Sequence, residues 1–125
     1  MIAIVLTKDR IISSPVEAEE FYVVDLDRGK IVSGPYRLRA RGSGLSKLGE
    51  IITKMPLYGA NSIIVSRIGS EGMELARSSG ARVFKANGRL EDLVGEGSVG
   101  IVEINLENID PGCPCCSLKH RQRMV

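Results

Sequence analysis

Two short apolar runs joined by one amphipathic stretch, all within residues 61–86, constrain the fold more than any other part of the sequence. The runs contain Ile63–Val65 and Arg82–Ala86, which are typical of short strands. Between them, Gly69–Glu71 predicts a tight turn and Met73–Ser79 predicts an amphipathic helix. Two strands connected through a helix form a parallel pair with a right-handed crossover. The sequence therefore predicts an α/β domain.

The preceding residues predict the rest of the sheet and a second helix. Ile2–Leu6 is wholly apolar, which is typical of a strand buried on both faces. Phe21–Leu26 and Lys30–Gly34 flank a glycine-containing turn and predict a β-hairpin. Apolar residues then recur at helical spacing from Leu45, and we expect this helix to end near Pro56. Because the hairpin adds an antiparallel pair, the sheet is expected to be mixed.

The remaining residues predict a brief helix at Leu90–Val94 and one further short strand at Val99–Ile104. The expected architecture is a mixed sheet of about five strands covered by two or three helices. We assign residues 1–110 to this domain and residues 111–125 to a basic tail that contains cysteine and histidine.

The composition indicates one folded domain with little excess charge. The 125 residues are 43% hydrophobic, and 17 Lys and Arg against 15 Asp and Glu leave a net charge of +2. That charge is too small to bind nucleic acid by its field alone. An aromatic content of 4% leaves few side chains on which bases could stack. Nucleic acid is therefore not the expected partner.

The sequence does not predict a membrane segment. No apolar run approaches the roughly 18 residues that span a bilayer, and Met1–Leu6 lacks the basic start and the cleavage site of a signal peptide. We expect a cytoplasmic protein. The single glutamine, Gln122, and the few asparagines are typical of a thermophile.

All three cysteines stand in Cys113-Pro114-Cys115-Cys116, and the only histidine, His120, follows in the same tail. Thiolate and imidazole groups this close could hold Zn²⁺, an iron ion or an iron–sulfur cluster. We predict Cys113, Cys115, Cys116 and His120 as metal ligands. The spacing is not that of a standard zinc site, because adjacent cysteines cannot easily take neighbouring tetrahedral positions. Free or redox-active thiols and a contact between chains are the alternatives.

The turn after Ile63–Val65 is a candidate anion site. In a parallel unit this turn lies at the carboxyl end of the strand, where backbone N–H groups and the positive end of a helix hold anions. Arg67, Gly69 and Ser70 are the expected anion-binding residues, and Ser70 is also expected to cap the helix. The turn matches no nucleotide-binding motif, so simple capping is the alternative interpretation.

Alternating arginines form a second basic feature. In an extended segment, Arg37, Arg39 and Arg41 would project on one side. Lys47 or Lys54 could complete a basic patch that engages RNA. A solvated loop is the alternative, because no aromatic residues are interleaved with the arginines.

The acidic residues do not follow the pattern of a metal-dependent nuclease. Such an enzyme needs several carboxylates that converge on its sheet, and the apolar strand Ile2–Leu6 offers none. Asp9 follows that strand in a loop, while Asp25 and Asp27 lie beside the hairpin turn, where acidic residues are common. We therefore do not expect an enzyme.

Three stretches of the first 95 residues carry a resemblance to a known family. They are Ile12-Ser13-Ser14 through Ala18 to Phe21–Asp27, Gly59–Val65 with Ile68-Gly69, and Met73–Ala76 through Gly80–Phe84 to Glu91-Asp92-Leu93. In these stretches the chain resembles the dinitrogenase iron-molybdenum cofactor biosynthesis family. The resemblance implies a ribonuclease-H-like three-layer α/β fold. It also implies a non-catalytic binding or carrier protein for an iron–sulfur or related metal cofactor.

The expected partner is then a metal-cofactor donor or acceptor protein, with a homodimer as a further assembly. The alternative function is an anion- or nucleic-acid-binding module without catalytic activity. The chain departs from the family at two places. Pro15-Val16-Glu17 stands where the family often has His-Phe-Gly, which removes an imidazole that could ligate a metal cluster. Ser66-Arg67 stands where the family often has paired glycines, which favours an anion there over a flat cluster face.

Overall fold

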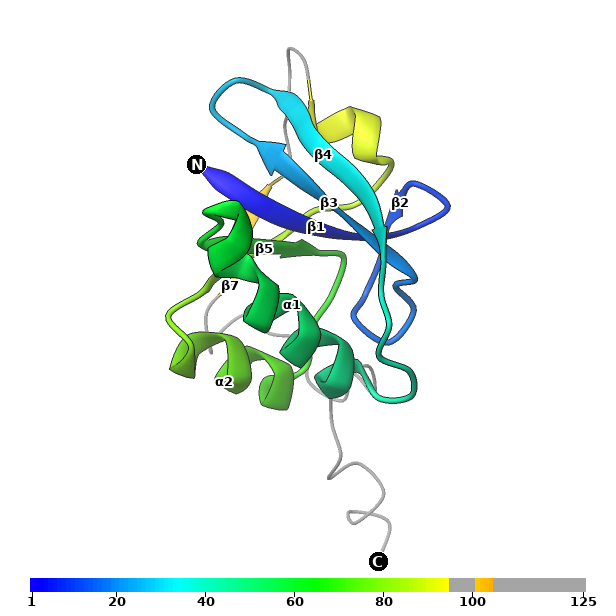
Figure 1. Ribbon diagram of the computed structural model, residues 1–125, viewed down its shortest axis with the longest axis vertical. Coiled ribbons are helices and arrows are strands. Elements are labelled where there is room, and N and C mark those ends of the chain that lie inside the picture. The colour runs from blue at the N-terminus through cyan, green and yellow to red at the C-terminus, as the bar shows by residue number, and fades with distance from the viewer. Residues whose placement is uncertain (95–100, 105–125) are drawn as a thin grey trace, which may run out of the picture.

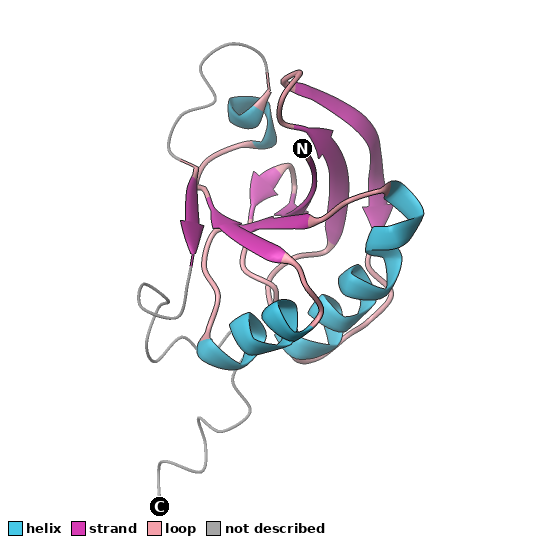
Figure 2. Ribbon diagram, turned by 90° about the vertical axis from the view of Figure 1, so that its left-hand side faces the viewer, coloured by secondary structure: helices cyan, strands magenta, loops and turns pink. Residues whose placement is uncertain are grey.

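The structure is a computed structural model that describes residues 1–94 and 101–104. Its strands form one mixed sheet, with both α-helices packed on the same face (Figures 1 and 2). In chain order the elements are β1 (Ile2–Lys8), β2 (Ile11–Ile12), β3 (Glu20–Asp25), β4 (Lys30–Arg37), α1 (Gly44–Tyr58), β5 (Ser62–Val65), α2 (Ser70–Ser78), β6 (Arg82–Lys85), the 3₁₀-helix η1 (Leu90–Leu93) and β7 (Val102–Ile104).

The strand order is β4-β3-β1-β5-β6-β7, and β2 pairs with the end of β1. β1 and β5 are parallel, as are β5 and β6. The other neighbouring pairs are antiparallel. This arrangement confirms the predicted α/β class, the hairpin β3–β4 and the parallel unit β5–α2–β6. No helix in the described part of the chain has an apolar stretch that would reach across a bilayer.

The sheet is larger than predicted, because the described residues contribute seven strands in place of about five. The strand β2 was missed because two residues are too few to show a period-2 pattern. It pairs Ile12 with Thr7 and Ile11 with Lys8 across a tight turn in which Asp9 and Arg10 both have positive φ. The predicted strand Val99–Ile104 is represented by β7, and residues 99–100 lie outside the described part.

The predicted end of the first helix near Pro56 is confirmed, because α1 ends at Tyr58, two residues later, with the proline inside its last turn. The helix ends at Gly59, whose φ of 67° is left-handed, and its N–H points back to the carbonyls of Met55 and Pro56. At the other end, the Ser43 hydroxyl accepts a hydrogen bond from the N–H of Ser46 at 3.2 Å.

The central strand β1 has a buried core on each side, as predicted. Ile4 and Leu6 belong to the core under α1 and α2. Ala3 and Val5 belong to the core on the opposite face, which η1 covers through Leu90. Burying a large aliphatic side chain stabilises a fold by about 1.5–3 kcal/mol. The two cores therefore fix β1 in the sheet and set the positions of the loops that follow the parallel strands.

Candidate functional site

The parallel strands β1, β5 and β6 end at one edge of the sheet, which we call the carboxyl edge. β3 lies beside β1 on one side of the pair β1 and β5, and β6 lies beside β5 on the other side. The chain therefore leaves the two strands in opposite directions across the sheet, which is a topological switch point. In open α/β sheets, ligands usually bind beside the carboxyl ends of the strands at such a point. The Ser66 N–H donates to the Ser13 carbonyl at 3.1 Å and joins the two loops at the switch. The carboxyl edge is therefore the candidate site.

The predicted anion-binding residues lie on this edge, between β5 and α2. Gly69 is buried and is the N-cap of α2, so the expectation that Ser70 caps the helix was wrong. The helix begins one residue earlier than the capping role requires, and its N-cap, a glycine, has no side chain to accept a hydrogen bond. Ser70 and Arg67 are exposed, and Glu71 adds a carboxylate to the first turn. The arrangement leaves backbone N–H groups at a positive helix end without a side-chain cap.

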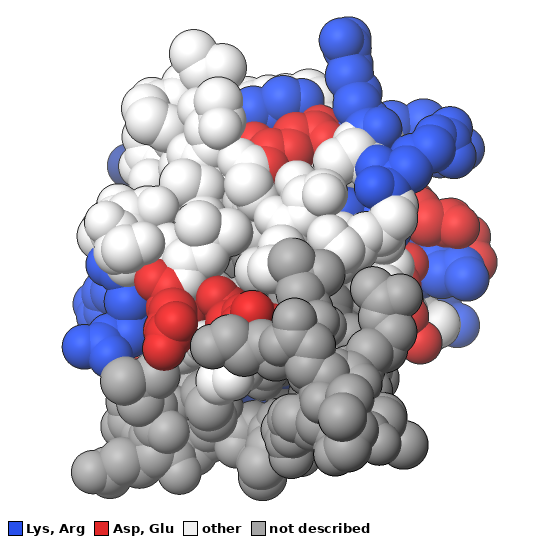
Figure 3. All heavy atoms as spheres, turned by 90° about the horizontal axis from the view of Figure 1, so that it is seen from below, with Lys and Arg blue, Asp and Glu red and all other residues white. Residues whose placement is uncertain are grey.

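A separate pocket of about 260 Å³ lies between the end of β4, the loop that follows it and the first turns of α1. We call it the basic pocket. Residues that line it include Ala18, Glu19, Arg37, Arg41, Gly42 and Lys47. In Figure 3, Lys and Arg side chains gather at the right of the view, the side on which α1 begins in Figure 1, with acidic side chains next to them.

The predicted arginine patch forms only in part. Arg37 and Arg41 line the basic pocket together with Lys47, but Arg39 does not. Strand β4 ends at Arg37, so the alternation that would place all three arginines on one side stops there. Lys54, the other predicted member, pairs with the Glu50 carboxylate at 3.0 Å.

Lys47 links α1 to the segment before β3. Its ammonium nitrogen donates to the carbonyls of Val16 at 2.8 Å and Ala18 at 2.7 Å. Burial lowers the pKa of Lys47, and the positive charges of Lys8 and Arg41 lower it further, while Glu19 opposes the shift. The lysine therefore fixes one wall of the pocket as well as contributing charge.

Glu50 fixes the opposite wall, and the sequence did not single it out. Its carboxylate accepts hydrogen bonds from the N–H of Arg39 at 2.9 Å and the N–H of Ala40 at 2.7 Å. Burial alone would raise the pKa of Glu50, but these two bonds and Lys54 outweigh burial, so the pKa lies below its ordinary value. The four-residue spacing of Glu50 and Lys54 is typical of an ion pair on a helix, and it was the one feature of the sequence that could have pointed to Glu50.

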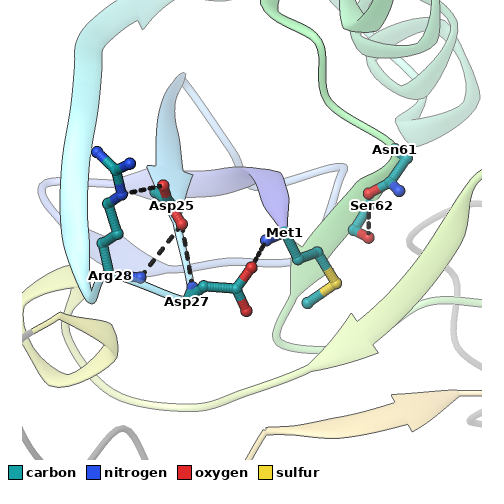
Figure 4. Close-up of polar contacts among 6 residues, drawn as sticks. All are labelled: Met1, Asp25, Asp27, Arg28, Asn61 and Ser62. Carbon is teal, nitrogen blue, oxygen red and sulfur yellow. Dashed lines mark hydrogen bonds and ion pairs between the residues drawn. The ribbon is translucent and has the colours of Figure 1, made fainter.

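The predicted turn carboxylates lie at the opposite edge, beside the start of β1 (Figure 4). The Asp25 carboxylate accepts from the N–H groups of Asp27 and Arg28 at 3.1 and 3.2 Å, and the Arg28 guanidinium lies 3.7 Å away. Asp27 contacts the amino group of Met1. These carboxylates stabilise the hairpin turn and the chain terminus. Among residues 1–94 and 101–104, no three acidic, cysteine or histidine side chains gather closely enough to hold a metal ion.

The predicted metal ligands Cys113, Cys115, Cys116 and His120 lie outside the described residues. The boundary at residue 110 between domain and tail lies there as well. Both therefore stay predictions from the sequence.

The fold of the chain is similar to the folds of two solved structures. It is similar to a candidate NifB protein from Thermotoga of the DUF35 family, solved by NMR, with 20% sequence identity and a TM-score of 0.54. That match covers 82% of this chain and 91% of the other. The crystal structure of PH0822 is similar at 17% identity and a TM-score of 0.52, covering 74% of this chain and 86% of the other. No protein-family model and no curated protein matches the chain.

Proposed function

We propose that the protein is a non-catalytic carrier of an iron–sulfur cluster or a related metal cofactor. The observation that supports this proposal is the backbone shared with the candidate NifB protein over 82% of the chain. The family resemblance of the sequence agrees with it. We further assign the domain to the ribonuclease-H-like folds. The central strand β1 supports this assignment, because it has an antiparallel hairpin on one side and parallel strands on the other.

In this proposal Cys113, Cys115, Cys116 and His120 supply the ligands, since soft sulfur donors suit iron and zinc. The folded domain supplies the surface that a cofactor donor or acceptor protein recognises. No catalytic residue is needed for such a role, because loading and release of the cofactor are binding steps.

Reconstitution of the full chain with iron and sulfide under anaerobic conditions tests the proposal. We expect visible absorbance typical of thiolate-ligated iron, which the paired change Cys115→Ser and Cys116→Ser should abolish. Ser117→Ala is the control in the same segment and should leave the absorbance unchanged. Thermal melts of all three proteins check that the domain stays folded. A colourless wild-type product, or absorbance equal in wild type and the cysteine variant, would contradict the proposal.

A second candidate is an anion-binding module, and the absence of a side-chain cap on α2 favours it. Arg67, Gly69 and Ser70 would hold a phosphate group of a small molecule or of RNA at the positive end of that helix. This reading predicts salt-sensitive binding of an RNA oligonucleotide or inorganic phosphate that Arg67→Gln weakens. Binding that is indifferent to the Arg67 change would rule out this site.

A further inference from the structure

The basic pocket holds more positive charge than its walls neutralise. Three cations line it, Arg37, Arg41 and Lys47, against the single carboxylate of Glu19. The guanidinium groups of Arg37 and Arg41 have no hydrogen-bond or ion-pair partner among the described residues. A protein usually pairs or disperses charges that it brings together around a cavity. We propose that the basic pocket is a binding site for a small phosphate ester.

The geometry of the cations favours a tetrahedral oxyanion. An arginine presents five N–H donors in a planar fork that matches phosphate oxygens in pairs. Arg37 is the last residue of β4, Arg41 stands four residues later in the loop that follows, and both line the pocket. Two such forks can contact different oxygens of one phosphate.

Lys47 adds a third donor. Its ammonium group has three N–H bonds, and two of them are used on the carbonyls of Val16 and Ala18. One N–H therefore remains for a ligand. Because those two bonds also fix the lysine in place, little side-chain entropy is lost when an anion binds.

The walls of the pocket are held before any ligand arrives. Glu50 binds the N–H groups of Arg39 and Ala40, which positions the loop between the two arginines. The first turn of α1 contains no acidic residue, so the positive end of that helix adds a field of the same sign. The site is thus preorganised for negative charge.

The volume limits the size of the ligand. The pocket has a volume of about 260 Å³ and opens to solvent. That space accepts a phosphate group with a small organic part. It does not accept a folded macromolecule.

Calorimetric titration of the full chain with glycerol 3-phosphate and with inorganic phosphate tests the site. We expect saturable binding of glycerol 3-phosphate that Arg41→Gln weakens about tenfold, a loss comparable to one charge-assisted hydrogen bond. Arg77→Gln removes an equal charge from the exposed end of α2, away from the pocket, and should leave the affinity unchanged. Glu19→Gln removes the opposing carboxylate and should tighten binding severalfold.

Three results would overturn the proposal. They are no binding of either phosphate by the wild type, equal weakening by the Arg41 and Arg77 changes, and weaker binding after Glu19→Gln. Tight binding of an RNA oligonucleotide that Arg41→Gln weakens, without binding of glycerol 3-phosphate, would also overturn it in favour of a nucleic-acid surface. Both arginines are exposed, so the variants should fold, and thermal melts verify this. The test involves no cysteine, so its result is independent of the carrier function.

Discussion

Replacing Glu50 by glutamine should destabilise the loop that carries the arginines of the basic pocket. The Glu50 side chain is only 13% exposed. Its two oxygens accept from Arg39 at 2.9 and 3.0 Å and from Ala40 at 2.7 Å, and Lys54 donates at 3.0 Å. Glutamine keeps one acceptor oxygen but loses the charge, and its amide N–H₂ would face a backbone donor.

The size of the effect follows from these bonds. A hydrogen bond to a charged group contributes about 1.5–3 kcal/mol, and Glu50→Gln removes or weakens at least one of them. We therefore expect the free energy of unfolding at pH 7 to fall by about 2 kcal/mol. Urea unfolding followed by circular dichroism measures this value. Glu74→Gln, an exposed change on α2, is the control and should stay within about 0.5 kcal/mol of the wild type.

The loss of stability caused by Glu50→Gln should depend on pH. The pKa of Glu50 is lower in the folded protein than its ordinary value of 4.5. The stabilisation of the fold by the charged Glu50 carboxylate is therefore fully present above the pKa of the unfolded state. It is lost as the pH falls through the lower pKa of the folded state. The stability difference between wild type and Glu50→Gln should be full at pH 7 and should shrink below about pH 4. A difference that is below about 0.5 kcal/mol at pH 7, or constant down to acid pH, would refute the reasoning.

Two further predictions concern the fold itself. Leu48→Ala, at a fully buried position of α1, should lower the free energy of unfolding by about 2–5 kcal/mol in the same urea assay, and a loss under about 1 kcal/mol would show that this core position is not close-packed. Gly59→Ala and Gly49→Ala should have opposite signs in thermal melts, although neither added methyl meets a neighbour within 4 Å. Gly59 has a φ of 67° and alanine there should cost about 1 kcal/mol, whereas alanine at Gly49 inside α1 should stabilise by about 0.5–1 kcal/mol. Equal signs would argue against the helix end at Gly59.

Local patterns were enough to predict the central elements. The apolar run of β1, the hairpin turn before Lys30 and the change of period through β5–α2–β6 each depend on residues close in sequence. The two local errors have local causes. β2 is too short to show a period, and the N-cap of α2 is Gly69 in place of Ser70 because the helix begins one residue earlier than expected.

The basic pocket could be predicted only in part, because its walls come from distant segments. Lys47 bonds to carbonyls 29 and 31 residues before it, and no local pattern reports such a contact. The alternation of arginines indicated a basic feature but extended it past Arg37, where the strand ends. The role of Glu50 depends on a loop that returns 10 and 11 residues earlier in the chain. Its ion pair with Lys54 was the only part that spacing alone could suggest.

Elemental analysis of the full-length protein, isolated without exposure to oxygen, tests the carrier function most directly. The carrier function predicts iron or zinc bound in a fixed ratio to the chain, and loss of that metal when Cys115 and Cys116 are both changed to serine. Protein that is isolated without either metal, or a metal content that does not depend on the two cysteines, would contradict it.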